Sequence, residues 1–329
     1  MADGDSAQNI QQRVKPILDK VAVEGLRAWL KAIGLPAPAL SRASITEHIA
    51  TLIVKKQLTE DALEAGLIGF EEASDMRIYL FRMDKNEAQK GKKALVQTLQ
   101  HSAIPIATKR TFAGNKTQPM SPVYAHIEGD LLRVKWAEEQ EMVKPNPQGS
   151  ALDRKPVQKR AVLIADFAAG TAELRLNPPE NVHSYADGAG RPTAPAYYNA
   201  YLQKALDVLD CKAEALELRS VIKSLVEQEE PRVIRIHIDD HTNQKNYKTK
   251  TSGPRADIRD DPDWQLAYKK NGHTWAWDAQ SFYWLPKVSS GFLTREVFTH
   301  IDAEEGFAKV NADCSNDEVE YVVTQIRAH

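Results

Sequence analysis

The sequence has 329 residues, of which 27% are charged and 42% hydrophobic, and its formal net charge is -2. This composition is ordinary for a folded protein, and the length allows two domains. The near-neutral charge excludes a general attraction to nucleic acid, so any such attraction must come from local groups of cations. The two cysteines, Cys211 and Cys314, form no CxxC pair. A zinc ribbon or a disulfide framework is therefore not expected, and a reducing, cytoplasmic location is favoured.

The chain begins with a polar stretch that lacks the basic and apolar regions of a signal peptide. No later apolar run reaches membrane-spanning length. We therefore expect a soluble protein without membrane contact.

Residues 8–75 show a helical pattern. Apolar residues recur at helical spacing from Ile10 to Ile33, with a possible interruption near Gly25. Gly34 and Pro36 end this run, as is typical of a helix C-terminus.

Two more helices are predicted before residue 75. Ser44, with Glu47 three residues later, fits a capping box at the start of one of them. Thr59 precedes two acidic residues that suit the positive end of a helix dipole, so a further helix is expected to start there. The pattern predicts a three-helix head over residues 8–75.

The remaining residues, 76–329, form the predicted body. Strand-forming patterns occur at 77–83, on both sides of the turn Gly129-Asp130, on both sides of Gly170, and at 233–238, 273–277, 281–285 and 295–301. Residues 197–228 are helical in pattern, and a terminal helix is expected with Asn316 as its cap. Strands and helices come in runs, so the class is α+β with a mainly antiparallel sheet. A polar loop is expected at 144–160 and a basic loop at 241–259.

The segment VEGLRAWLKAIGLPAPALSRASITEHI, residues 23–49, combines an apolar helix, a Gly-Leu-Pro break, a short extended piece and a second apolar helix. It resembles a SAP-type helix-extended-helix module. The resemblance implies binding to the phosphate backbone of double-stranded DNA, often near A·T-rich sequence. The extended piece lacks the glycine and lysines usual in that family, and Glu47 in the second helix repels phosphate. The alternative is a helical packing module for a protein partner.

The resemblance also assigns roles to single residues. It implies a core formed by Leu26, Leu30, Ile33 and Leu35, and DNA contacts from Arg27, Lys31, Ser41 and Arg42. The N-terminus of a helix offers unpaired N–H groups to a phosphate, and Ser41 and Arg42 lie just before one. Binding of this kind weakens as salt rises.

Two segments of the body are rich in cations. Residues 107–119 carry Lys109, Arg110 and Lys116. The 241–259 segment has one acidic residue, Asp257, and holds Lys245, Lys248, Lys250, Arg255 and Arg259, with Tyr247 among them. A basic loop with an aromatic residue can follow a phosphate backbone and stack on a base. A solvated loop without a ligand is the alternative.

Aromatic residues gather in HTWAWDAQSFYWLPK, which is predicted to be a hairpin. Trp275 would share a strand face with Trp277, and Phe282 with Trp284. Core packing is favoured here over a platform for stacked bases.

The segment VIRIHIDDH is the best candidate for catalysis. Its isoleucines alternate onto one side of a strand, and Arg235, His237 and Asp239 onto the other, with His241 at the strand end. His237, Asp239 and His241 could bind a divalent metal in a nuclease. An exposed polar sheet face explains the same pattern.

We therefore predict a non-catalytic protein without a cofactor, which binds double-stranded DNA through its head and basic loops. The SAP resemblance implies a setting in DNA maintenance or genome defence, with a nucleoid or nuclear location as well as a cytoplasmic one. We also expect a protein partner. The alternatives are a protein-interaction or scaffold subunit of a larger complex and a metal-dependent nuclease.

Overall fold

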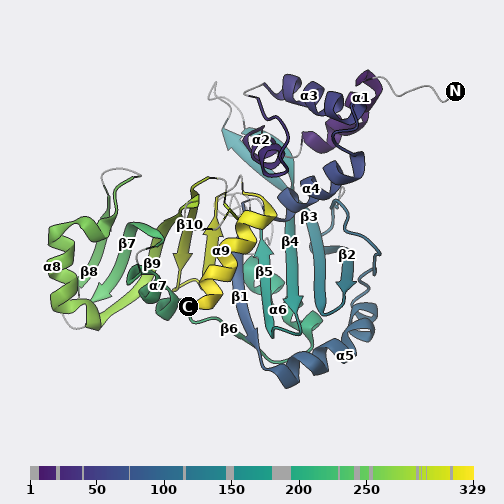
Figure 1. Ribbon diagram of the computed structural model, residues 1–329. Helices are drawn as coiled ribbons and strands as arrows, with labels where there is room; N and C mark the ends of the chain where they lie inside the picture. The colour runs from purple at the N-terminus through teal and green to yellow at the C-terminus, as the bar shows by residue number, and fades with distance from the viewer. Residues whose placement is uncertain are drawn as a thin grey trace. The chain divides into compact units, whose positions relative to one another are not determined.

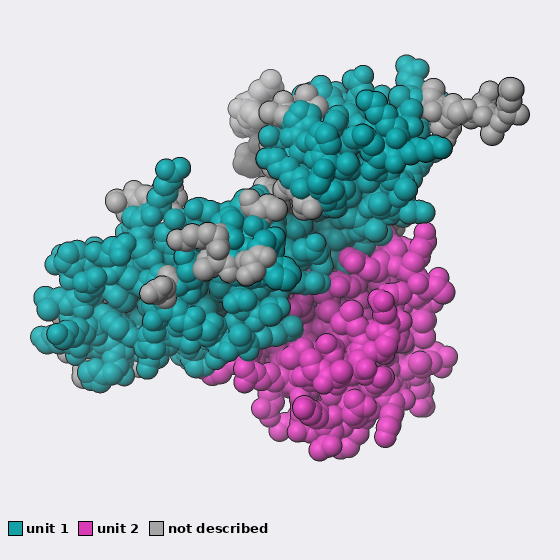
Figure 2. Space-filling model, in the orientation of Figure 1, with its two compact units in different colours: residues 1–74, 219–304, 310–329 teal, residues 75–218, 305–309 magenta. Residues whose placement is uncertain are grey.

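The computed structural model describes residues 7–19, 23–38, 41–73, 75–113, 116–145, 152–179, 194–228, 230–240, 245–251, 255–286, 289, 291–293, 295–311 and 314–329. The chain forms two compact units, coloured separately in Figure 2. The first unit holds residues 1–74, 219–304 and 310–329, and the second holds 75–218 and 305–309. The class is α+β, and the strands pair antiparallel, as the sequence predicts.

Helices of the head lie in the first unit. They are α1 (Ala7–Leu18), α2 (Val23–Ala32), α3 (Arg42–Val54) and α4 (Glu60–Ala73). The prediction of three helices is therefore wrong, because the first apolar run contains both α1 and α2. Helices α1 and α2 each bury a separate row of apolar side chains, which includes Leu18 in α1 and Leu26 in α2. The apolar spacing continues across the break, so periodicity alone does not reveal it.

Helix α3 begins earlier than its capping box predicts. Ser41 is the N-cap, and its side chain accepts a hydrogen bond from the N–H of Ser44 at 3.4 Å. At the other end of the chain, Ser315 rather than Asn316 caps α9 (Asn316–Ala328), in a capping box with Glu318. At each helix start, two nearby residues have side chains that could act as the N-cap: Ser41 or Ser44 for α3, and Ser315 or Asn316 for α9. The sequence alone does not show which of them does.

Strands of the second unit follow the order β2-β3-β4-β5-β1-β11, with β6 also paired to β1. Their bounds are β1 (Arg77–Met83), β2 (Ser121–Glu128), β3 (Leu131–Pro145), β4 (Leu152–Asp166), β5 (Thr171–Leu176), β6 (Ala213–Ala215) and β11 (Phe307–Val310). Helices α5 (Lys85–His101) and α6 (Ala194–Leu209) pack on one face of this sheet (Figure 1). Alternate residues of β3, such as Leu132 and Trp136, are buried in that core.

The predicted polar loop at 144–160 is largely strand, which corrects the prediction. Strands β3 and β4 pair without interruption from Leu131↔Asp166 to Pro145↔Leu152. Residues 146–151 lie outside the described residues. Residues 153–156 are exposed, so this end of the hairpin has little apolar surface to bury. A polar, solvated strand and a polar loop have the same composition, and the prolines favoured the loop.

Strands of the first unit follow the order β10-β9-β7-β8. They are β7 (Arg232–Asp240), β8 (Lys245–Lys250), β9 (Trp275–Trp284) and β10 (Val297–Asp302). Helices α7 (Leu218–Val226) and α9 lie against one face of β9. Arg219 of α7 forms an ion pair with Asp278 at 3.0 Å, and Tyr321 of α9 contacts Trp284.

Two expectations for this sheet are corrected. The predicted hairpin at 273–285 is the single strand β9, because Asp278 is buried and ion-paired where a turn was expected. The predicted basic loop at 241–259 contains strand β8 and the short helix η2 (Ile258–Asp260), followed by α8 (Pro262–Asn271) and η3 (Gly272–Thr274). Within the described residues, no helix is both long and apolar enough to cross a membrane.

Packing within the head depends on a glycine of α4. A Cβ atom at Gly66 would overlap the indole of Trp29, a buried residue of α2, whereas one at Gly69 would lie 3.4 Å from the Cβ of Asn316. We predict that Gly66→Ala lowers the free energy of unfolding by about 1–2 kcal/mol, because overpacking outweighs the gain in helix propensity. Urea denaturation followed by tryptophan fluorescence measures this change. Gly69→Ala is the matched control and is expected to be neutral or slightly stabilising; equal effects of both changes would contradict the packing argument.

Candidate nucleic-acid interface

One face of the β10-β9-β7-β8 sheet gathers basic side chains from three strands. We call it the cationic face and define it by Arg235, His237, Lys248, Lys250 and His300, together with the acidic residue Asp302. In the register, Arg235 of β7 lies opposite Lys250 of β8, and His237 lies opposite Lys248. Residues that pair directly across antiparallel strands project on the same side of the sheet. Strand pairing therefore brings the cations of β7 and β8 together.

Strand β9 contributes the small residues at the centre of the cationic face. Its Ala279 pairs with His237 and with Asp302, and its Ser281 pairs with Arg235 and with His300. Both β9 residues are small and buried, which leaves room for the longer side chains on either side. The Oγ atom of Ser281 lies 3.0 Å from Nδ1 of His300, and this hydrogen bond holds the ring in place.

The cationic face forms a shallow depression of about 470 Å³. Arg235, Lys248 and Lys250 are exposed, whereas His237, His300 and Asp302 are partly buried. Asp302 is the only acidic residue among those that line the depression. The opposite face of the same strands is buried, and includes Ile236 and Ile301 together with the polar residue Gln280. A sheet with one buried face leaves the other open to solvent or to a ligand.

The arrangement of charge is unfavourable without a ligand. Like charges directly opposite each other in an antiparallel pair destabilise it by roughly 0.2–1 kcal/mol, and Arg235 and Lys250 are such a pair. Among the described residues, neither side chain forms an ion pair with an acidic group. An anion between them would remove the repulsion. The chemistry of this face therefore suits a phosphate group, to which guanidinium and ammonium groups both donate.

Other cations of the 241–259 segment have different surroundings. Arg259 is engaged in the fold: its Nη2 donates to Asp257 Oδ2 at 2.6 Å and to the carbonyl oxygen of Pro231 at 3.0 Å. Arg255 is exposed. The side chains of Lys245 and Tyr247 lie outside the described residues, although the backbone of both belongs to β8. Of the predicted phosphate contacts in this segment, the structure brings Lys248 and Lys250 together on the cationic face.

Residues of the head that were predicted to face DNA also differ in their surroundings. Arg42 donates from Nη1 to the carbonyl oxygen of Leu18 at 2.9 Å, and thereby joins α3 to α1. Ser41 caps α3, and Arg27 is partly buried. Lys31 is exposed in the last turn of α2, whereas the two other cations predicted to face DNA, Arg27 and Arg42, are partly buried.

The apolar positions implied by the SAP resemblance are only partly buried. Leu26 and Leu30 are fully buried in the head. Leu35 is partly buried, and Ile33 is 45% exposed, so the expectation that Ile33 belongs to the core is wrong. Ile33 follows the end of α2, where the chain turns away from the core before Gly34, whose φ is 74°.

The 107–119 cations belong to the second unit and not to the cationic face. The backbone of Lys116 exchanges two hydrogen bonds with the side chain of Gln158, at 3.3 and 2.9 Å, which fixes this segment on β4. Lys109 is exposed and Arg110 is partly buried. Contact of Lys109, Arg110 and Lys116 with DNA therefore stays a prediction, independent of the cationic face.

Of the three residues in the predicted metal site, only His237 has a described side chain. His237 lies on the cationic face, whereas the side chain of Asp239 and the whole of His241 lie outside the described residues. Within the part of the chain that the structure describes, no group of three or more His, Cys, Asp and Glu side chains could hold a metal ion.

The aromatic residues near β9 pack on one another. Trp264 stacks on Tyr268 of the same helix at 4.9 Å between ring centroids, and Tyr268 contacts Trp275 and Trp277. Trp277 is 2% exposed. This geometry agrees with core packing rather than with a platform for bases. Burial and a hydrogen bond to Glu227 raise the pKa of Tyr268 to about 12.

The predicted site residues did not include Arg235 or His300, two basic residues of the cationic face. The alternation of VIRIHI places Arg235 beside His237, and that signal was visible in the sequence. His300 had no such signal, because its position depends on β10 pairing with β9. A comparison of the sequence with protein-family models and with curated proteins finds no match. The cationic face is therefore interpreted from its own chemistry.

The pairing of Arg259 with Asp257 generates a stability prediction. Both side chains are largely buried, at 17% and 15% exposure. We expect Arg259→Ala to lower the free energy of unfolding by about 1.5–3 kcal/mol, because charge-assisted hydrogen bonds are lost and Asp257 keeps its charge. Arg255→Ala, a loss of one exposed cation a few residues earlier, is the control and should change stability by less than about 0.5 kcal/mol. Similar urea midpoints for Arg259→Ala and the unchanged protein would show that the ion pair contributes little.

Proposed function

We propose that the protein binds double-stranded DNA through the phosphate backbone, without catalysing a reaction, and that the cationic face makes the main contact. The observation that supports this proposal most directly is the pairing of Arg235 with Lys250 across neighbouring strands. Two permanent cations held side by side on an open face repel each other, and an anion bound between them relieves the repulsion. A polyanion with regularly spaced phosphates meets this requirement.

The side chains suit phosphates better than bases. Arginine donates through a planar fork that matches two phosphate oxygens, and lysine acts as a compact point charge. Contacts of this kind fix the position of a protein on the duplex but carry no sequence information. With few phosphates neutralised, we expect weak, salt-dependent binding, with a Kd of roughly 10⁻⁴–10⁻⁶ M at physiological salt.

The head supplies a second argument for DNA. Residues 23–49 resemble a SAP-type module, and Lys31 of this segment is exposed at the end of α2. The head and the cationic face belong to the same unit. Two weak contacts on one protein can bind a long ligand more tightly than either alone, provided that the geometry lets both engage.

A protein-interaction role is the second candidate. Leu266 of α8 is 69% exposed and Phe292 is 66% exposed. Large apolar side chains in contact with solvent are common at surfaces that bind other proteins, although scattered ones also occur elsewhere. Such a role is compatible with DNA binding, because it uses different residues.

The first prediction concerns the cationic face. The double change Lys248→Glu/Lys250→Glu should weaken binding to a duplex and reduce the slope of log K against log salt by about 2, since two phosphate contacts are lost. Fluorescence anisotropy with a labelled duplex over a salt series measures both quantities. Lys93→Glu/Lys155→Glu makes the same change in net charge at exposed residues of the second unit and is the matched control. An unchanged slope in the first variant, or an equal loss in the control, would remove the cationic face from the interface.

A separate prediction concerns the head. Lys31→Glu should reduce the same slope by about 1, because one phosphate contact is lost. Lys55→Glu is the matched control, since Lys55 is an exposed lysine at the C-cap of α3. If both variants bind DNA like the unchanged protein, the head takes no part and its resemblance to a SAP module has no functional meaning.

A further inference from the structure

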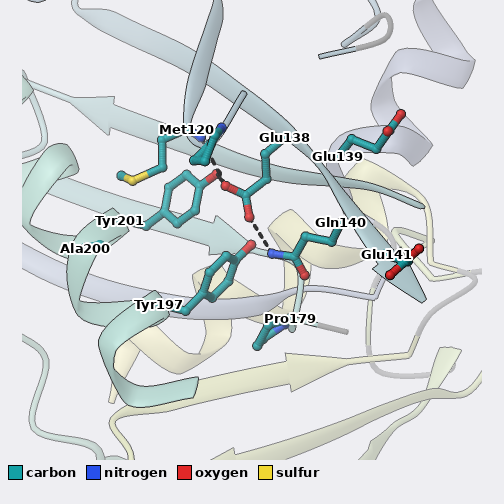
Figure 3. Close-up of a pocket in the computed structure, with 10 residues that line it drawn as sticks. Met120, Glu138, Glu139, Gln140, Glu141, Pro179, Tyr197, Ala200 and Tyr201 are labelled. Carbon is teal, nitrogen blue, oxygen red and sulfur yellow. Dashed lines mark hydrogen bonds between the residues drawn. The ribbon is translucent and has the colours of Figure 1, made fainter. Parts of the chain in front are cut away.

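The second unit contains a pocket of about 280 Å³ that DNA binding does not use (Figure 3). It is formed by strand β3, by helix α6 and by the segment before β2. Its lining includes the carboxylates of Glu138, Glu139 and Glu141 and the side chains of Gln140, Tyr197 and Tyr201. Pockets for drug-sized ligands usually measure about 300–1,000 Å³, so the ligand of this one is small.

Alternation along β3 determines which side chains point toward Tyr197 and Tyr201. Glu138 and Gln140 project toward Tyr197 and Tyr201, whereas Glu139 and Glu141 project away from them (Figure 3). Glu138 is 6% exposed, and Glu139 is exposed. The pocket therefore has one buried carboxylate, Glu138, and two more solvent-accessible ones, Glu139 and Glu141, in its lining.

The carboxylate of Glu138 is held by neutral donors. The hydroxyl of Tyr201 donates to Oε2 at 3.2 Å, the backbone N–H of Met120 donates to the same oxygen at 3.0 Å, and the amide of Gln140 donates to Oε1. Burial raises the pKa of Tyr201 above its ordinary value, so its phenol stays protonated and remains a donor. These bonds fix the carboxylate in one orientation without neutralising its charge.

Lys159 lies opposite Glu138 in the register of β3 and β4 and is itself buried, at 6% exposure. No ion pair among the described residues joins a cation to Glu138 itself. A buried charge is costly unless it is paired with the opposite charge. An ammonium group in the pocket would provide that pair.

The walls of the pocket suit the rest of such a ligand. The rings of Tyr197 and Tyr201 meet edge to face, with centroids 5.2 Å apart, and both tyrosines are almost fully buried. Met120, Pro179 and Ala200 add apolar surface. Aromatic faces attract organic cations, and the attraction is stronger where water is excluded.

We propose that this pocket binds a small organic amine, whose ammonium group pairs with Glu138 and whose apolar part lies against Tyr197 and Tyr201. An anionic ligand is disfavoured, because the charge of Glu138 would repel it inside the pocket. A neutral ligand of the same shape gains the apolar contacts but not the ion pair. The pocket lies in the second unit, so this proposal does not depend on the cationic face or on DNA binding.

Three probes of nearly equal size and different charge test the proposal on the full chain: benzylamine, benzyl alcohol and phenylacetate. Titration calorimetry, with ligand-observed NMR for weak binding, measures each affinity. We expect benzylamine to bind at least about tenfold more tightly than benzyl alcohol, and phenylacetate not to bind. Equal binding of the amine and the alcohol, preferential binding of phenylacetate, or no binding of any probe would overturn the proposal.

Two variants and a control locate the binding. Glu138→Gln should abolish the preference for the amine over the alcohol. Glu128→Gln, which removes an exposed carboxylate of β2 outside the pocket lining, should leave the preference unchanged. Ala200→Leu changes an exposed residue of α6 that lines the pocket, and it should block both ligands by filling the space. Circular dichroism checks that each variant is folded. If Glu138→Gln does not fold, Ala200→Leu decides, because benzylamine binding that survives it does not occur in this pocket.

Discussion

The alternation of side chains along antiparallel strands is the constraint on which both candidate sites depend. In β7 it separates Arg235 and His237 from the buried Ile236, and pairing with β8 then places Lys250 and Lys248 opposite the two basic residues. In β3 it turns Glu138 toward Tyr197 and Tyr201 and leaves Glu139 exposed. Neither site is a contiguous motif. Each arises because a strand presents every second residue to one side, and a neighbouring element completes the set.

The two sites have opposite electrostatic character and lie in different units of the chain. The cationic face is open, and its charges are shared among exposed side chains that salt can screen. In the pocket at Glu138 the innermost charge is buried among tyrosines, where screening is weak. The first arrangement suits a long ligand bound through many similar contacts. The second suits a small ligand bound through one strong contact.

Local patterns predicted several helices and strands correctly, but not which elements pair with one another. The alternation in VIRIHI predicted strand β7 and its polar side, and the Gly129-Asp130 turn predicted the β2-β3 hairpin. The sequence pattern did not identify His300 or Glu138 as site residues. The position of His300 depends on the pairing of β10 with β9, and that of Glu138 depends on the packing of α6 against β3. Arg259 shows a different limit. Its charge suggested a ligand contact, but Asp257 two residues earlier was an equally available partner, and the sequence does not decide between them.

The repulsion between Arg235 and Lys250 also lowers the stability of the fold. Selection for stability alone would replace one of these residues by a neutral or acidic side chain, because their repulsion weakens the contact between β7 and β8. Natural proteins keep such unfavourable arrangements where activity requires them, and the remainder of the core compensates. On the opposite side of this sheet, Ile236 of β7 and Ile301 of β10 are buried. Under the proposed function, a relative that does not bind DNA is expected to carry a neutral or acidic residue in place of Arg235 or Lys250 and to be more stable.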